Sequence, residues 1–167
     1  GENAFTNCTG EVFVDCVLDD RSSSYSATFS GNSFTKVVAG ANASLGDCCF
    51  YSSAALETLV VNEGVKRIGK NAFRECYKLK DVQLPNSLET IDESAFYNCY
   101  EIESIVVTAK ELLGKYAFGS ASKLTDIEIK GTKHIGAGAF WGGPVPTRLV
   151  LEEGIQIIDE ESFWCSD

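Results

Sequence analysis

Residues 79–99 read LKDVQLPNSLETIDESAFYNC, and this stretch decides the fold because most of it recurs along the chain. Pairs of a small residue and phenylalanine, such as Ala95-Phe96, return with phenylalanine at positions 50, 73, 96, 118, 140 and 163, spaced 22 or 23 residues apart. The alternation Val82-x-Leu84 is typical of a short strand that points two side chains into one interior. Similarity at a fixed period indicates a repeat architecture.

Other apolar positions keep the same spacing. An aliphatic residue lies five positions before each of these phenylalanines, and another lies six positions after the first four, with Pro146 as the exception after the fifth. No single unit can bury these side chains alone, so the units must stack as coils of a solenoid, with strands pairing in parallel along one face. A β-sandwich of amphipathic strands would also alternate, but five consecutive copies in register favour the solenoid. Because Pro146 breaks the pattern, we expect distortion around Gly142 to Pro144.

The residue four positions before each phenylalanine is always Gly or Asp, as at Gly46, Gly69 and Asp92. Gly tolerates a φ near or above zero best, and Asp tolerates it better than most residues. We therefore expect a tight corner of that conformation in every coil.

Residues 34–167 form the regular array, whereas residues 1–33 fit the repeat less well. Extending the period backwards puts Phe5 and position 28, a threonine, in phenylalanine slots, with Val14 and Cys16 in inward strand slots. This pattern predicts a degenerate first coil. The alternative is a capping hairpin that pairs Val12–Leu18 with Tyr25–Phe29, and a degenerate coil that serves as the cap reconciles the two. Both ends fall at the same phase of the repeat, which suggests a segment of a longer array.

The units resemble the BspA-type class of leucine-rich repeats, through the pattern Leu79-x-x-Val82-x-Leu84-Pro85-x-x-Leu88-x-x-Ile91-x-x-x-Ala95-Phe96-x-x-Cys99. The resemblance covers residues 34–163, with few departures. It implies a right-handed leucine-rich-repeat solenoid, β-rich, with a parallel strand ladder on the concave face and short turns, 3-10 or strand segments elsewhere. Proteins of this class are typically surface or secreted proteins associated with adhesion to host matrix proteins and to other cells. The resemblance implies an extracellular or cell-surface location, a protein partner and no catalytic residues.

The composition argues against two classes of partner. Acidic residues number 24 against 14 basic ones, and the resulting net charge of −10 would repel a phosphate backbone. No apolar run reaches the roughly 18 residues that a membrane-spanning helix needs. We therefore expect neither nucleic-acid binding nor membrane insertion of this segment.

The seven cysteines and the single histidine form no catalytic or metal-binding pattern. Five cysteines fall in inward slots, where a thiol behaves as a small hydrophobic group: Cys8, Cys16, Cys49, Cys76 and Cys99. Cys48 and Cys165 lie off these slots and are the better candidates for pairing or reactivity. His134 and the acidic runs at 152–153 and 159–161 are expected on the surface. We predict no catalytic residue, no metal and no cofactor.

The outward side of the strands is the main candidate for binding. Its middle column comprises Val38, Val60, Gln83, Val106, Glu128 and Val150, and the neighbouring column comprises Thr58, Asp81, Ser104, Asp126 and Arg148. The four valines are either an apolar contact stripe or a consequence of the preference of valine for strands.

A secondary column follows the phenylalanines and comprises Tyr51, Arg74, Tyr97, Trp141 and Trp164, interrupted by Gly119. Aromatic and arginine side chains are typical of binding hot spots, but these could equally stack on each other along the coils.

The sequence therefore predicts a non-enzymatic protein-binding or adhesion module of a cell-surface or secreted protein, which binds through the concave strand face. The alternative is a structural spacer within a longer surface protein, with no ligand of its own. A deep pocket lined by converging titratable groups would instead indicate an enzyme.

Overall fold

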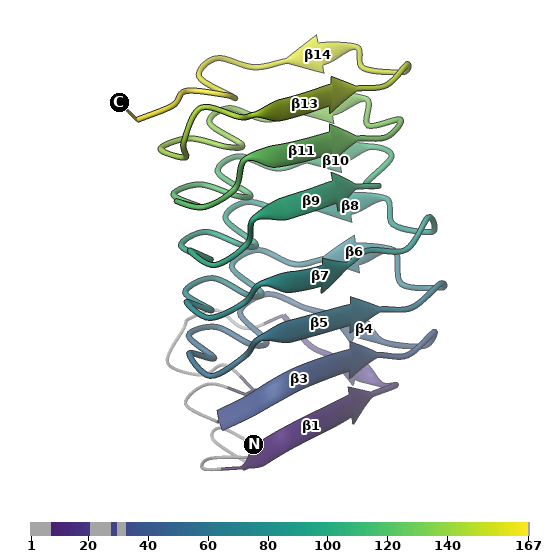
Figure 1. Ribbon diagram of the computed structural model, residues 1–167. Helices are drawn as coiled ribbons and strands as arrows, with labels where there is room; N and C mark the ends of the chain where they lie inside the picture. The colour runs from purple at the N-terminus through teal and green to yellow at the C-terminus, as the bar shows by residue number, and fades with distance from the viewer. Residues whose placement is uncertain (1–7, 21–27, 30–32, 167) are drawn as a thin grey trace.

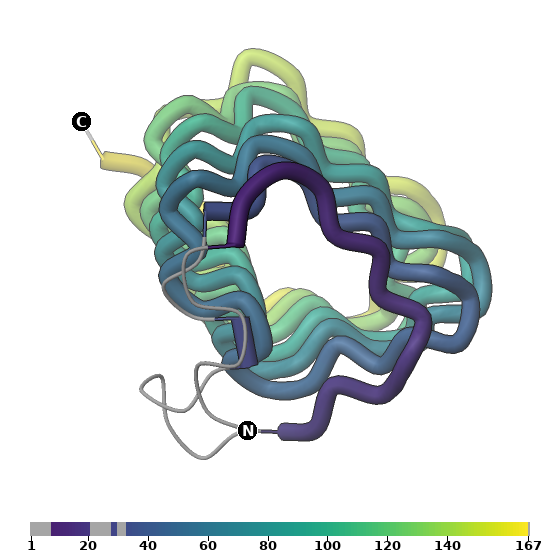
Figure 2. The backbone as a smooth tube through the Cα atoms, turned by 90° about the horizontal axis from the view of Figure 1, so that it is seen from below, coloured from purple at the N-terminus to yellow at the C-terminus, as the bar shows by residue number. Residues whose placement is uncertain are grey.

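The computed structural model describes residues 8–20, 28–29 and 33–166, and the chain winds through them as a solenoid of β-strands (Figure 1). Viewed along the axis, successive coils trace similar outlines that lie over one another (Figure 2). Each coil contributes one longer strand and one strand of two residues. No described residue belongs to a helix that could span a bilayer.

The longer strands form one face of the solenoid, which we call the long-strand face. They are β1 (Thr9–Val14), β3 (Ser33–Ala39), β5 (Thr58–Val61), β7 (Asp81–Gln83), β9 (Ser104–Val107), β11 (Asp126–Ile129) and β13 (Arg148–Leu151). Behind them in Figure 1 lie the two-residue strands, β2 (Val17–Leu18), β4 (Ser44–Leu45), β6 (Arg67–Ile68), β8 (Thr90–Ile91), β10 (Leu112–Leu113), β12 (His134–Ile135) and β14 (Ile157–Ile158).

Strand pairing follows the repeat. Neighbouring long strands pair in parallel, with Val37 opposite Leu59 and Ile105 opposite Ile127. The short strands form one continuous seven-stranded sheet, whereas the long strands form two sheets, β1-β3-β5-β7 and β9-β11-β13. The predicted parallel-strand solenoid is confirmed, and the interruption between β7 and β9 is a feature that the periodicity did not predict.

A column of phenylalanine rings forms the centre of the core. Phe50, Phe73, Phe96 and Phe118 are fully buried. Their rings stack nearly parallel, with centroid separations of 5.3, 5.4 and 5.0 Å along this series. A period of 22–23 residues places each ring over the ring of the preceding coil, so the repeat converts one sequence position into a continuous stack.

The first coil corrects the extrapolated register. The ring that stacks under Phe50 is that of Phe29, at 4.6 Å, and not the residue at position 28. Val12 and Val14 lie opposite Val37 and Ala39, so they occupy the inward slots assigned above to Val14 and Cys16.

The strand slots shift because extra residues separate β1 from β3, so that Val14 precedes its partner Ala39 by 25 positions, whereas Phe29 precedes Phe50 by 21. Cys16 is consequently exposed. The predicted Phe5 slot and most of the proposed second hairpin strand, Tyr25–Phe29, lie outside the described residues.

The recurrence of Gly or Asp four positions before each phenylalanine has a different cause from the one predicted. Gly69 and Gly114 do not have positive φ. The main chain of the preceding coil lies too close for a side chain there. A Cβ atom on Gly69 would lie 2.6 Å from the Asp47 amide nitrogen, and one on Gly114 would lie 2.6 Å from the Asp92 carbonyl carbon. Close approach of the preceding coil therefore selects glycine there. The left-handed conformation occurs two residues later, as at Asn71 (φ 55°) and Ser94 (φ 56°).

The last coil leaves its aliphatic side chains uncovered. Leu149 and Leu151 are each 42% exposed, and Ile157 and Ile158 are each 49% exposed. The equivalent residues of interior coils, such as Ile127 and Ile129, are buried because the next coil packs on them.

Candidate binding surface

The long-strand face presents the two predicted columns in register. Val38 lies opposite Val60, and Glu128 lies opposite both Val106 and Val150. Val106 is 43% exposed, whereas Val38, Val60 and Val150 are half-buried. Gln83 and Glu128 interrupt the valines, so the apolar area consists of small separate patches.

Charged side chains of these columns pair with each other at the C-terminal end. The Arg148 guanidinium donates to Asp126 and Glu128, each at 2.8 Å, and Lys130 lies 2.9 Å from Glu128. Hydrogen bonds from Lys130 and Arg148 lower the pKa of the Glu128 carboxyl. Thr58 is half-buried, whereas Asp81 and Ser104 are exposed. The structure thus joins Asp126, Glu128 and Arg148 in one ionic cluster.

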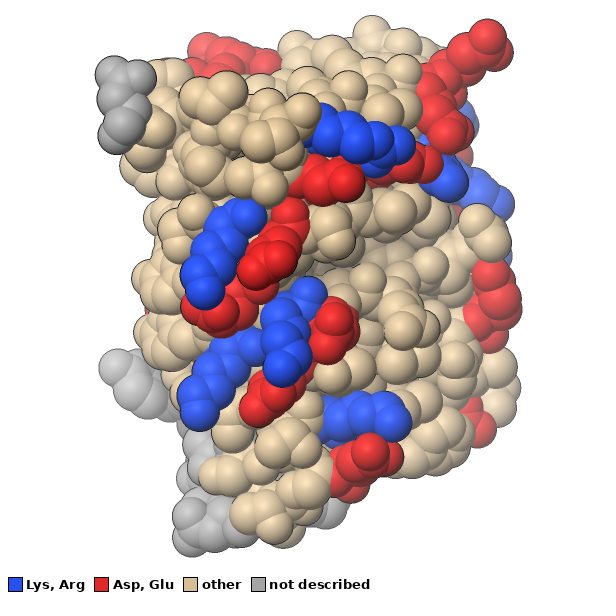
Figure 3. All heavy atoms as spheres, in the orientation of Figure 1, with Lys and Arg blue, Asp and Glu red and all other residues tan. Residues whose placement is uncertain are grey.

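Ion pairs between successive coils extend along the surface. Glu57 binds Lys80 at 2.8 Å and Glu101 binds Lys123 at 2.7 Å. Figure 3 shows such oppositely charged groups side by side along one margin of the long-strand face. The sequence contains a signal for these pairs, because the partners lie one period apart, although the repeat pattern alone did not identify them. Each exposed pair contributes little to stability, because water and salt screen its charges.

The secondary column is a stack of side chains. The Arg74 guanidinium lies 4.8 Å from the Tyr97 ring centroid, and the rings of Trp141 and Trp164 stack at 5.3 Å. The Tyr116 ring, which the spacing did not select, lies between two members of the column, 6.4 Å from the Tyr97 ring and 6.2 Å from the Trp141 ring. Tyr51 is half-buried. Mutual stacking therefore accounts for much of this column, and Trp164 remains 49% exposed.

A groove of about 470 Å³ crosses the corners next to the short strands, and most of its charged side chains form ion pairs. The Arg67 guanidinium donates to Asp20 at 2.9 Å, to Asp47 at 2.6 Å and to Asp92 at 2.6 Å. At the other end of the groove, His134 Nε2 lies 2.8 Å from Asp159. Lys70 and Glu93 form a further pair at 2.7 Å. These contacts link coils to one another.

The buried cysteines have a repeated structural contact. The Cys76 and Cys99 thiols donate to the Phe50 and Phe73 carbonyls at 3.4 and 3.3 Å. The buried hydroxyl of Ser53 makes the corresponding bond to Phe29 at 3.4 Å. A donor at this slot therefore satisfies a carbonyl inside the core.

The positions of two other cysteines correct the prediction. Cys48 was expected off the core, as a better candidate for pairing or reactivity than the inward cysteines, but it is buried. Burial, and to a smaller extent the neighbouring Asp47 carboxylate, raises the pKa of the Cys48 thiol. Cys165 is half-buried and donates to the Phe163 carbonyl at 3.2 Å. All seven cysteines are unpaired.

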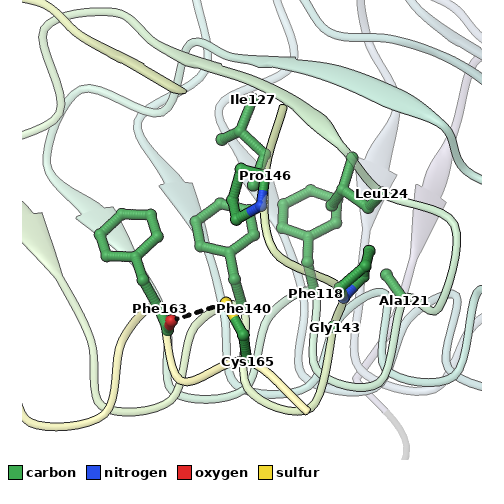
Figure 4. A pocket seen from close by; sticks show the side chains of 10 residues that line it. Phe118, Ala121, Leu124, Ile127, Phe140, Gly143, Pro146, Phe163 and Cys165 are labelled. Atoms are coloured by element: carbon green, nitrogen blue, oxygen red, sulfur yellow. Dashed lines mark hydrogen bonds between the residues drawn. The ribbon is translucent and has the colours of Figure 1, made fainter. Parts of the chain in front are cut away.

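A small cavity lies where Pro146 replaces the usual aliphatic residue. Figure 4 shows Pro146 beside the Phe140 ring, with Ile127 and Leu124 nearby. The cavity has a volume of about 10 Å³ and its lining is apolar apart from main-chain atoms and the Cys165 thiol. This space admits about one water molecule. Within the described ranges, no three His, Cys, Asp or Glu side chains gather as metal ligands.

A parallel β-solenoid with one phenylalanine column and repeating aliphatic positions defines a repeat protein of the leucine-rich class. Residues 43–167 match the family described as a BspA type leucine rich repeat region, in 6 copies. The chain belongs to this family, as its sequence pattern indicated. A search among curated proteins finds no match.

Three solved structures are similar in fold. A leucine rich cell surface protein from Faecalibacterium prausnitzii has a TM-score of 0.75 and 19% identity, over 97% of this chain and 48% of that one. The pneumococcal vaccine antigen PcpA has a TM-score of 0.63 and 22% identity, over 83% and 39%. The T. pallidum leucine rich repeat protein TpLRR has a TM-score of 0.62 and 21% identity, over 88% and 75%.

This chain thus spans about half the length of the F. prausnitzii protein. At these identities the likeness establishes the fold, and solenoids of this type are typically non-enzymatic scaffolds for protein interactions.

Proposed function

We propose that this protein is a non-catalytic adhesion module of a cell-surface or secreted protein, and that it binds another protein through its long-strand face. The partner is a host extracellular matrix protein or a protein of another cell surface. The carrying observation is the in-register pairing within each of the two long-strand sheets, which holds exposed and half-buried side chains from successive coils on one face.

The chemistry of this face supports protein binding. Val106 and the half-buried valines provide apolar area, and the flanking charged and hydroxyl side chains provide a polar rim. Protein interfaces combine these two components. The net charge of −10 disfavours nucleic acid as the partner. The surface location of the F. prausnitzii protein supports the same location here.

The experiment is binding of the purified chain to a panel of immobilised extracellular matrix proteins, before and after charging the valine column. Val60→Lys with Val106→Lys places two ammonium groups on the face, and we expect binding to fall about tenfold or more. The control, Glu89→Gln with Glu111→Gln, changes the net charge equally at two exposed residues beside the short strands. Unchanged binding in the valine variant rules out this face. No binding to any panel member by the parent chain favours a structural spacer.

A further inference from the structure

The interruption between β7 and β9 is the most distinctive feature of the long-strand face. In Figure 1 these two strands stand farther apart than the neighbouring arrows. Behind them, β6, β8 and β10 remain paired without a break. The two coils therefore separate only along the long-strand face, with the continuous short-strand sheet on the other side.

The main-chain hydrogen bonds show which amide and carbonyl groups lack a partner on the neighbouring strand. At the start of β7, the amides of Lys80 and Asp81 donate to Glu57 at 3.0 and 3.1 Å. At the start of β11, the amides of Thr125 and Asp126 donate to Glu103 at 3.0 and 3.2 Å. The equivalent bonds from Glu103 and Ser104 to Lys80 are absent from this part of the described chain.

The opening is bounded by contacts at both ends. The Tyr77 and Tyr100 rings stack at 5.5 Å before the strands begin. After the strands, the Thr108 hydroxyl donates to the Pro85 carbonyl at 2.8 Å. Between these points, the inward side chains Val82 and Leu84 are half-buried, unlike the buried Leu59 and Val61 of the preceding coil. The opening is thus a local feature of fixed extent.

A hollow of about 230 Å³ occupies this place and is lined by Lys80, Asp81, Glu101, Glu103 and Ser104. Its lining carries three carboxylates and one ammonium group. Lys80 is bound to Glu57, and Glu101 is bound to Lys123. Among the described residues, Asp81 and Glu103 have no ion-pair partner. The hollow therefore combines the unpaired edges of two strands with two carboxylates that form no ion pair.

We infer that this opening binds an extended peptide segment of the partner protein that carries a lysine or arginine side chain. The main chain of the segment pairs with the open polar groups of β7 and β9, in the manner of strand addition. Its basic side chain lies between Asp81 and Glu103, where the charge is complementary. This inference rests on the proposed function and names the kind of segment that the long-strand face takes.

The free protein provides the first test, through amide hydrogen exchange followed by NMR. The amides of Glu103 and Ser104 should exchange about tenfold faster than those of Thr125 and Asp126, which are the equivalent and hydrogen-bonded positions one coil later. Equal protection at the two sets would show that the strands are paired in solution, and would overturn the inference.

The second test uses a fluorescein-labelled peptide of eight residues, alternating lysine and threonine, and measures anisotropy and NMR shifts. We expect binding that shifts resonances of β7 and β9 and that weakens about tenfold in Asp81→Asn with Glu103→Gln. The matched control is again Glu89→Gln with Glu111→Gln. A peptide with alternate N-methylated amides should also lose binding, because it cannot pair its main chain.

The outcomes separate this inference from the proposed function. Equal weakening in the control variant, or shifts outside β7 and β9, would show non-specific attraction to an acidic protein and overturn the inference. Failure of the lysine peptide, together with matrix-protein binding that Val60→Lys with Val106→Lys abolishes, would overturn the inference alone. Failure of both kinds of binding would overturn the proposed function as well.

Discussion

Truncation of Phe96 to alanine tests whether the phenylalanine column holds the coils together. Phe96 is fully buried, and its ring lies 5.4 Å from Phe73 and 5.0 Å from Phe118. The substitution loses the free energy gained by burying the ring, removes both stacking contacts and leaves a cavity in the core. We expect the free energy of unfolding to fall by about 3–5 kcal/mol.

The matched comparison is Phe163→Ala in the last coil. The Phe163 ring is half-buried and contacts a single ring of the column, that of Phe140 at 5.2 Å. Because part of the Phe163 ring is already exposed to water and the ring has one stacking partner fewer, we expect the free energy of unfolding to fall by about 1–2 kcal/mol. The two variants differ in position but remove the same atoms.

Urea unfolding followed by far-UV circular dichroism measures both losses, and tryptophan fluorescence reports on the C-terminal coils through Trp141 and Trp164. Coincidence of the two signals is needed for a single free energy of unfolding. If Phe96→Ala and Phe163→Ala destabilise the protein equally, burial within the column does not determine coil stability, and the reasoning from the stack is wrong.

Two further predictions concern the surface and the core. Arg67→Gln should lower the free energy of unfolding by about 1 kcal/mol near pH 7. Arg67 lowers the folded-state pKa of Asp20 through a hydrogen bond, so this contribution is present above the unfolded carboxyl pKa and is lost as the pH falls through the folded value. Urea midpoints of parent and variant should therefore converge at acidic pH, and a constant difference would contradict the ionic account. For the thiols, alkylation followed by mass spectrometry should modify the exposed Cys16 in the native protein. Cys76, whose pKa burial raises to about 12, should react only after unfolding, and its rapid native modification would show that the core opens.

The period, the parallel ladder and most of the core followed from the sequence alone. Phe73 and Phe96 repeat at the spacing of one coil, and an apolar side chain at such a position can be buried only when the next coil covers it. Local pattern therefore determined which side of each coil faces inward. The same reasoning failed before β3, because Phe29 precedes Phe50 by 21 positions, fewer than in the later coils, and the column therefore passes through Phe29 and not position 28.

The tertiary structure alone decided how closely neighbouring coils approach. Gly114 is required by the carbonyl carbon of Asp92 in the preceding coil, and Gly119 leaves room for the ring of Tyr97, which packs against the ring of Tyr116. The opening between β7 and β9 is likewise invisible in the repeat, which continues through it with unchanged spacing. The physical reason is that periodicity specifies which residues meet across coils, whereas the separation between coils depends on the volumes and charges of all the side chains that meet there.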